Sequence, residues 1–212
     1  MRVICLSDTH GFHGGVAVPP GDVLVFAGDM CGPGRLSEVS SFARWLRGLP
    51  HRHKIVVAGN HDWPFVRDPQ TARQLIAFGG GTYLQDAGVV IDGVAFWGSP
   101  WQPEFCDWAF NLPRGPQLAR RWSLIPPGTN VLVTHGPPLG LLDQSYDGAP
   151  HLGCEDLAHR LRDLKDLRAH VFGHIHGGHG VLNGGHTRPK VVNASVCDES
   201  YAPVRPCQTI DV

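Results

Sequence analysis

Short runs of apolar residues recur along the 212-residue chain, and residues typical of turns bound each run. The runs are nearly continuous in Val, Ile, Leu and Phe, with little alternation of apolar and polar positions. Such runs are typical of strands that are buried on both faces. The pattern predicts five buried strands, at residues 3–6, 23–27, 55–58, 131–133 and 171–172.

Between several of these runs, apolar residues recur at helical spacing, which predicts amphipathic helices over residues 36–49, 70–78 and 154–167. Strands that alternate with helices indicate an α/β domain with largely parallel strands. Two other segments predict hairpins: Asp92-Gly93 separates two apolar runs, and Gly184-Gly185 is a second turn signal. We therefore expect two mixed sheets that pack face to face, with helices outside.

No internal repeat or low-complexity linker divides the chain, so we expect a single domain over residues 1–212. The segment 99–116 is long and rich in aromatic residues. Such a segment is more often a folded surface loop with its own small core than an interface with a partner.

Polar residues follow all five apolar runs directly. In chain order they are Asp8 and His10, then Asp29, then Asn60, His61 and Asp62, then His135, and finally His174 and His176. In an open α/β sheet, sites form beyond the carboxyl ends of the strands, so these side chains are expected to meet in one crevice. Glycine precedes Asp29, Asn60 and His174, which suits sharp turns where backbone and side chains approach a ligand closely.

Asp, Asn and His supply oxygen and nitrogen ligands, which suit Mn, Fe, Zn or Co and do not suit calcium. Seven ligands exceed the needs of one ion, whereas two ions that share a bridging carboxylate would use them all. Each motif alone is weak evidence, since Gly-Asp is usually a turn and a lone histidine is usually structural. The ordered set after five strands favours a two-metal site, with Asp8, His10, Asp29, Asn60, His135, His174 and His176 as ligands.

Composition narrows the choice of partners and compartment. The chain has 18 basic and 19 acidic side chains and a formal net charge of −1, so a long nucleic acid is not an expected partner. The apolar runs are too short to span a bilayer or to form the core of a signal peptide, which favours a soluble, cytoplasmic protein. Six cysteines without a CxxC pair indicate reduced thiols, although Cys197 and Cys207 are close enough in sequence for a disulfide.

The motifs Asp8-x-His10, Gly28-Asp29, Gly59-Asn60-His61-Asp62, His135 and Gly173-His174-x-His176 resemble the complete series of the calcineurin-like metallophosphoesterases. Three further segments resemble the narrower group that includes the mammalian metallophosphoesterase-domain (MPPED) proteins. They are Thr134-His135-Gly136-Pro137-Pro138-Leu139-Gly140, Gly98-Ser99-Pro100-Trp101 and Asn193-Ala194-Ser195.

The resemblance implies a four-layer α-β-β-α sandwich and a dinuclear centre. Carried over by motif, Asp8, His10 and His176 hold one metal, Asn60, His135 and His174 hold the other, and Asp29 bridges them. It also implies hydrolysis of a small phosphodiester, such as a cyclic nucleotide. Two adjacent metals can activate a bridging hydroxide for in-line attack on phosphorus. The alternatives are a phosphomonoesterase on the same site and a protein-interaction module in which the metals are structural.

His61 is not needed as a ligand, so we assign it to protonating or stabilising the leaving oxygen, with Asp62 orienting its ring. The alternative is a purely structural His61. Asn111 and His151 are weaker candidates for substrate contact, and a surface or capping role fits each of them equally well. The remaining histidines are expected to be structural: His13, His51, His53, His159, His170, His179 and His186.

Overall fold

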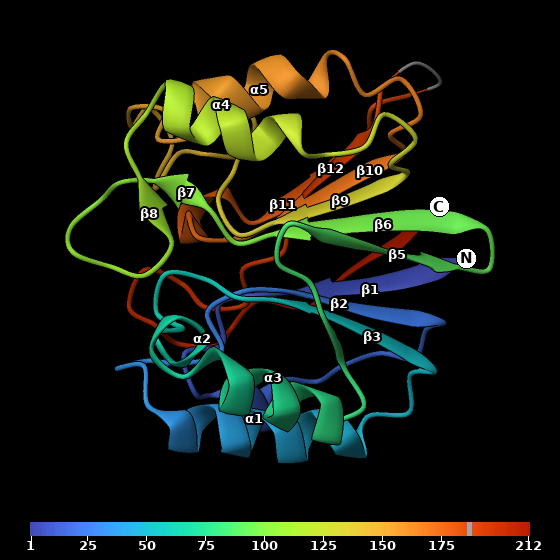
Figure 1. The fold of residues 1–212 in the computed structure, drawn as a ribbon, viewed down its shortest axis with the longest axis vertical. Helices are drawn as coiled ribbons and strands as arrows, with labels where there is room; N and C mark the ends of the chain where they lie inside the picture. Colours follow the sequence, from blue (N-terminus) through green and yellow to red (C-terminus); the bar gives the residue numbers. More distant parts are fainter. Residues whose placement is uncertain (186–187) are drawn as a thin grey trace.

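Two β-sheets pack face to face in the computed structural model, which describes residues 1–185 and 188–212 (Figure 1). The first sheet has five strands in the order β13 (Gln208–Asp211), β1 (Arg2–Leu6), β2 (Val23–Ala27), β3 (His53–Val57) and β4 (Thr82–Tyr83). Strands β1 to β4 run parallel, and β13 is antiparallel to β1 at the edge.

The second sheet has six strands in the order β11 (Gly180–Leu182), β12 (Lys190–Asn193), β10 (Ala169–Phe172), β9 (Val131–Thr134), β6 (Val94–Ser99) and β5 (Ala87–Ile91). Its four central strands are parallel, and the edge strands β11 and β5 are antiparallel to their neighbours. Both sheets are therefore mixed, as predicted. The two hairpins account for this in the six-stranded sheet, whereas β13, which no hairpin signal predicted, makes the five-stranded sheet mixed.

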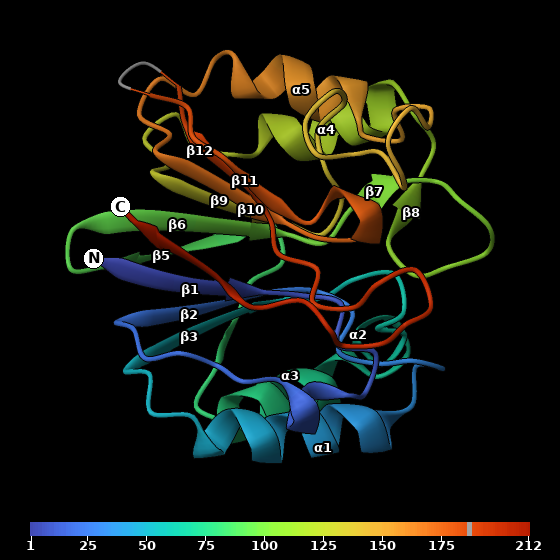
Figure 2. The same ribbon diagram turned by 180° about the vertical axis from the view of Figure 1, so that it is seen from behind.

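Helices cover the outer face of each sheet, which completes the four layers (Figures 1 and 2). Helices α1 (Leu36–Gly48) and α3 (Pro69–Phe78) lie on the five-stranded sheet, and α4 (Pro116–Ser123) and α5 (Glu155–Leu161) lie on the six-stranded sheet. Three short helical segments, α2 (Pro64–Arg67), η1 (His13–Gly15) and η2 (His176–Gly178), lie in connections. The predicted α-β-β-α sandwich is confirmed. None of the helices in residues 1–185 and 188–212 has the length and apolar character needed to cross a bilayer.

The apolar runs are continuous because each central strand contacts two cores. Along β1, Val3 and Cys5 point into the core between the sheets, whereas Ile4 and Leu6 point into the core under α1 and α3. Successive residues of a strand face opposite sides, so both sets are buried. A third core, which includes Trp122, lies between the six-stranded sheet and α4 and α5.

Both predicted pairs of hairpin strands form. Asp92 and Gly93 join β5 to β6, and both have positive φ, 47° and 81°, as a two-residue hairpin turn of this kind requires. Strands β11 and β12 pair antiparallel on either side of the second turn signal. Gly185, within this connection, has a φ of 71°. Residues 186–187, and with them His186, lie outside the described residues.

Helix α5 is shorter than the sequence predicted, because it ends at Leu161 instead of residue 167. The amide of Leu164 donates to the carbonyl of Leu161, so three-residue turns replace the helix. Leu164 and Leu167 are nevertheless buried in the same core as Leu157. Apolar spacing thus predicted correctly which side chains are buried, but not the end of the helix.

The aromatic segment 99–116 does not form a core of its own. It contains two short paired strands, β7 (Gln102–Pro103) and β8 (Asn111–Leu112), and its Phe110 is buried in the core that also contains α1. The segment is therefore attached to the main domain, and it lies beside the carboxyl ends of the parallel strands (Figure 1).

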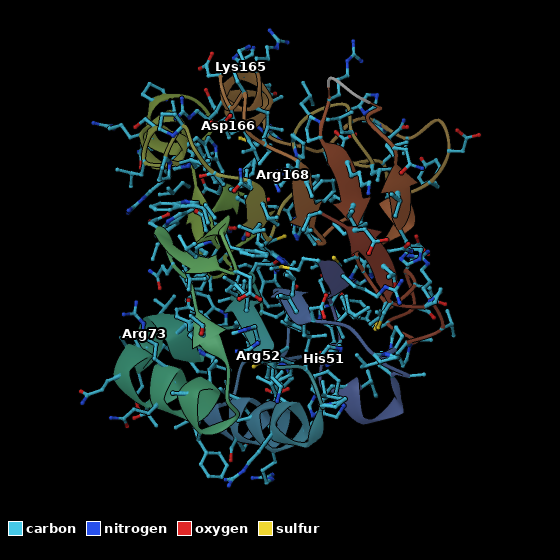
Figure 3. All side chains as sticks on the ribbon, turned by 90° about the vertical axis from the view of Figure 1, so that its right-hand side faces the viewer. His51, Arg52, Arg73, Lys165, Asp166 and Arg168 are labelled. Atoms are coloured by element: carbon cyan, nitrogen blue, oxygen red, sulfur yellow. The ribbon has the colours of Figure 1, made fainter. Side chains whose placement is uncertain are left out.

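The two ends of the sheets differ in composition. The view in Figure 3 faces the end where the strands begin, and it shows Arg52 just before β3 and Arg168 just before β10. The candidate ligands follow the other ends of these strands, near α2, β7 and β8 in Figure 1.

Candidate metal centre

The seven predicted ligands converge at the carboxyl ends of five parallel strands. Asp8 and His10 follow β1, Asp29 follows β2, Asn60 follows β3, His135 follows β9, and His174 and His176 follow β10. Potential ligand atoms lie within 4.8 Å of one another in three groups: Asp8, His10 and His176; Asp29, His135 and His174; and His10, Asp29 and His61.

Asp29 lies at the junction between these groups. Its Oδ2 is 3.3 Å from Nε2 of His135 and 3.9 Å from Nε2 of His10. Nε2 of His135 is also 2.8 Å from Oδ1 of Asn60. The first group is one of the two sets expected from the sequence motifs. The second group contains His135 and His174 of the other set together with Asp29, and Asn60 of that set contacts His135.

Three of the histidines are oriented by backbone carbonyls. Nδ1 of His10, His135 and His176 lies 3.3, 2.9 and 2.8 Å from the carbonyl oxygens of Cys31, Ala27 and Asp198, respectively. A carbonyl can only accept, so each Nδ1 donates its proton, and Nε2 faces the centre, where it offers a lone pair once the ring holds no second proton. This is the arrangement that orients metal-binding histidines.

The distance between two of these rings can be compared with the distance expected between two ligands of one metal ion. Nε2 of His10 and Nε2 of His176 are 3.2 Å apart, and in neutral rings both atoms are acceptors. Two nitrogens bound to one ion at about 2.1 Å lie roughly 3 to 3.5 Å apart, so a cation would fit between them, in place of a proton held by one of the rings. The donor set and its geometry therefore fit divalent transition metals.

The two carboxylates are held in the ionised state. Burial alone would raise the pKa of Asp8, but the hydrogen bond and charge of His176 hold that pKa well below its ordinary value. Its Oδ2 also accepts from the hydroxyls of Ser7 (2.5 Å) and Ser195 (2.7 Å) and from the amide of His174 (3.0 Å). Asp8 is thus an oriented anion at pH 7.

Asp29 and His135 form a buried ion pair in the metal-free protein. Burial opposes both charges, but the charge of His135 lowers the pKa of Asp29, and Asp29 raises the pKa of His135 to about 9. By contrast, burial and the neighbouring His135 lower the pKa of His174 to about 4, so His174 is neutral and available as a ligand. A metal ion would have to replace the proton of His135.

Four of the seven residues adopt a left-handed backbone: φ is 54° at Asp8, 43° at His10, 59° at Asp29 and 67° at His174. Asp and His tolerate this region better than most residues, but it remains costly, and such conformations cluster at functional sites. Each strand ends abruptly there, which turns the side chain towards the centre.

The glycines that precede three of the ligands leave room for the side chains of other ligands. A Cβ added to Gly28 would overlap the ring of His135, one on Gly59 would overlap the carboxylate of Asp29, and one on Gly173 would overlap Asp8. The sequence analysis expected a close approach at these three positions, and the structure confirms it.

His61 lies beside the centre, but a different group orients its ring. Nδ1 of His61 is 2.7 Å from the carbonyl oxygen of Gly32, and the His61 amide donates to Oδ1 of Asp29 (2.8 Å). The carboxylate of Asp62 instead accepts from backbone amides of Asp29 (2.9 Å), Cys31 (3.0 Å) and Gly59 (2.8 Å). The expected role of Asp62 is therefore corrected: it fixes the turns that carry the ligands.

A cavity of about 530 Å³ opens over the centre. Its lining includes His10, Asp29, Asn60, His61, His174 and His176 on one side. Phe105 and Trp108 of the aromatic segment, Arg114, Leu152 and Tyr201 form other parts of the wall. A cavity of this size suits a small-molecule substrate.

Sequence reasoning missed several of these residues. Tyr201 has φ 64° and places its ring edge-on to the rings of His10 (4.6 Å) and His176 (5.4 Å). Arg114 donates to the carbonyls of Leu152 and Gly153. No sequence motif marks Tyr201 or Arg114. Trp108 lies in the aromatic segment 99–116, for which the sequence predicted no functional role.

The two weaker candidates for substrate contact have other contacts, and neither belongs to the cavity lining within the described part of the chain. Asn111 donates to the carbonyls of Phe105 (3.0 Å) and Cys106 (3.1 Å), so it shapes the aromatic segment. His151 places Nδ1 2.6 Å from the buried carboxylate of Asp143. Several other histidines make structural hydrogen bonds, namely His13, His51, His170 and His179.

Comparisons with known proteins agree with this geometry. The family model "Calcineurin-like phosphoesterase" matches residues 1–178. Human metallophosphoesterase domain-containing protein 1 is 41% identical over 232 residues, which cover 100% of this chain and 71% of that protein. The narrower resemblance to the MPPED-type group is thereby confirmed.

Solved structures confirm the fold. One crystal structure, 18% identical, matches with a TM-score of 0.69 over 91% of this chain and 89% of the other. The protein TT1561 of Thermus thermophilus, 15% identical, matches with a TM-score of 0.56 over 99% and 98%. With the family model and the 41% identical relative, the ligand series identifies this chain as a member of the calcineurin-like phosphoesterase family.

Proposed function

We propose that this chain is a dinuclear metal-dependent phosphodiesterase that hydrolyses small phosphodiesters, cyclic nucleotides among them. The observation that carries the proposal is the pair of ligand groups that meet at Asp29 below a cavity of about 530 Å³. Family membership supports a phosphoesterase, and the geometry supports two ions.

In this proposal, Asp8, His10 and His176 hold one divalent ion, Asn60, His135 and His174 hold the other, and Asp29 is shared. The ions, each Mn, Fe, Zn or Co, would supply Lewis acidity and an activated water when bound. Two divalent ions outweigh the two carboxylates, so the centre would attract an anionic phosphate.

In this proposal, His61 protonates the leaving oxygen and Asp62 supports the turns that carry the ligands. His61 lines the cavity, and the Gly32 carbonyl holds its Nδ1 at 2.7 Å, so Nε2 is the ring nitrogen left to serve a substrate. We assign to Nε2 the transfer of a proton to the leaving oxygen. Asp62 keeps the turns of Asp29 and Gly59 in place through their amides.

The remaining wall of the cavity favours a substrate with one phosphate and an apolar or aromatic organic group. Phe105, Trp108 and Leu152 supply apolar surface, and Glu104 adds negative charge to the lining. Arg114 is already paired with Glu155, and Glu199 with Arg205. Further phosphate groups on a substrate would therefore meet repulsion from Glu104 without gaining a free cation among these side chains.

A screen of metal-free protein supplied separately with Mn, Fe, Zn or Co tests the proposal. The substrates are bis(p-nitrophenyl) phosphate, p-nitrophenyl phosphate, and 2′,3′- and 3′,5′-cyclic nucleotides. We expect metal-dependent hydrolysis, with diesters preferred over the monoester, and two bound ions per chain by elemental analysis. A preference for p-nitrophenyl phosphate would instead indicate a phosphomonoesterase. Two bound ions without hydrolysis of any ester would favour an interaction module.

The cytoplasm is the compartment that we propose. In support, all six cysteines lie among the described residues and are free thiols, including Cys197 and Cys207. Thiols persist in reducing compartments.

A further inference from the structure

The imidazole of His61 contacts two other rings. The indole of Trp108 stacks on it, with ring centroids 4.2 Å apart and planes inclined by 29°. The ring of His10 meets it edge-on at 4.6 Å. Trp108 belongs to the aromatic segment and lies 47 positions further along the chain, so this contact joins two distant parts of the sequence.

We propose that Trp108 is a positioning residue that holds the imidazole of His61 in one orientation for proton transfer. This inference rests on the catalytic role proposed for His61. The torsion that rotates a histidine ring has a broad energy profile, so the single hydrogen bond to Gly32 constrains it only partly. A stacked indole covers one face of the ring and removes much of that freedom.

Trp108 is itself firmly placed. The amide of the next residue, Ala109, donates to the carbonyl of Asn60 (3.1 Å), which directly precedes His61. The side-chain amide of Gln102, which is buried, donates to the carbonyl of Ala109 (3.0 Å). Phe110 is buried in the core under the five-stranded sheet. The indole is thus fixed relative to the turn that carries His61.

A positioning role differs from substrate binding in its kinetic signature. Misplacement of a catalytic group by about 1 Å can cost roughly 100-fold in rate. Because His61 acts on the leaving oxygen, the loss should grow as the leaving group becomes a poorer one. A stack that only bound substrate would instead raise KM, whatever the leaving group.

The test compares Trp108→Ala, Trp108→Phe and wild type on aryl phosphodiesters with graded leaving groups. We expect Trp108→Ala to lower kcat by about 10- to 100-fold for poor leaving groups and by less than about threefold for p-nitrophenolate. Trp108→Phe should restore kcat to within about threefold. Phe78→Ala, an exposed aromatic residue on α3, is the matched control.

A double-mutant cycle separates action through His61 from other effects. In a His61→Ala background, Trp108→Ala should cause no further loss of kcat. An equal loss in both backgrounds, or a loss independent of the leaving group, would overturn the inference. Elemental analysis must show the same metal content in all variants.

A second readout does not depend on turnover. In ¹⁵N-histidine-labelled protein loaded with zinc, the Nδ1–H of His61 should give a slowly exchanging signal in wild type and Trp108→Phe. The signal should be lost in Trp108→Ala, and its persistence there would overturn the inference. If the wild-type protein hydrolysed no ester, the proposed function would be refuted. The exchange of the His61 Nδ1–H signal would still show whether Trp108 positions the ring.

Discussion

Nε2 of His135 lies 3.3 Å from Oδ2 of Asp29, and both side chains are buried. Asp29 raises the pKa of His135 to about 9, above the ordinary value of 6.5. The pair therefore stabilises the metal-free protein fully below pH 6.5, and this contribution is lost as the pH rises through about 9. We expect the free energy of unfolding of the metal-free protein to fall between about pH 7 and 10, measured by urea denaturation.

Asp29→Asn is the control for this pH dependence, because it removes the charge that raises the pKa of His135. The variant should show a flatter profile over the same range. A metal must displace the same proton, so metal affinity in wild type should increase from about pH 7 to 9, by up to about tenfold per pH unit, in calorimetric titrations. An affinity independent of pH would contradict the ligand role of His135.

Asp62→Asn should destabilise the protein although it removes no ligand. The carboxylate accepts hydrogen bonds from the backbone amides of Asp29, Cys31 and Gly59. In the Asn variant, the amino group would face some of these amides, and two donors cannot form a hydrogen bond. We expect a loss of about 1–3 kcal/mol in metal-free protein, by chemical denaturation. Asp166→Asn at an exposed position is the matched control, and an equal effect in both variants would refute this role.

Gly173→Ala should weaken metal binding, most strongly at the site that includes Asp8, without unfolding the protein. The added methyl group would overlap the carboxylate of Asp8 and the hydroxyl of Ser7, so Asp8 must move. Elemental analysis should find fewer than two ions per chain, while circular dichroism remains close to wild type. Gly128→Ala, where nothing lies within 4 Å of the added Cβ, should bind metal normally. Full metal occupancy in Gly173→Ala would show that Asp8 is not needed.

His61→Ala should keep both metals and lose turnover selectively. Since His61 is assigned to the leaving oxygen, we expect kcat to fall by about 100-fold or more on esters with poor leaving groups and much less on p-nitrophenyl esters. Steady-state kinetics combined with metal analysis provide the measurement. Unchanged turnover on a poor leaving group would leave His61 with a structural role only.

Chelation should lower the thermal stability of the loaded protein. Each of the two proposed ligand sets includes residues that follow strands of both sheets, so a bound ion would link the sheets. Ligands that bind only the folded state add about 2.7 kcal/mol at a concentration about 100 times the dissociation constant. Calorimetry with and without chelator should show a higher Tm with metal, whereas equal values would argue against binding at this site.

The parts of the fold and site that the sequence predicted share one physical origin. Buried strands leave continuous apolar runs, and parallel strands end together, so the sequence alone predicted that Asp8, Asp29 and His135 meet in one crevice. The end of α5 could not be predicted, because Leu164 is buried whether it lies in a helix or in a turn.

The sequence also could not predict contacts to backbone groups or contacts between distant loops. The partner of the His61 ring is the carbonyl of Gly32, a group that every residue possesses. The stacking of Trp108 on His61 depends on how a loop folds back, and apolar periodicity does not encode that path. Tyr201 carries no motif at all, so only its strained backbone and position single it out.

The apolar layer between the sheets has a further consequence for the choice of metal. Side chains such as Val25 and Val133 fill that layer and set how far apart the two sheets stand. Interiors of this kind are close-packed, so a change in their volume shifts the sheets relative to each other. Such a shift would widen or narrow the gap between opposing donors and alter which ionic radius is accommodated. For the proposed centre, selectivity among Mn, Fe, Zn and Co would then be tuned partly from the hydrocarbon interior, and proteins with identical ligands would differ in the metal that they prefer.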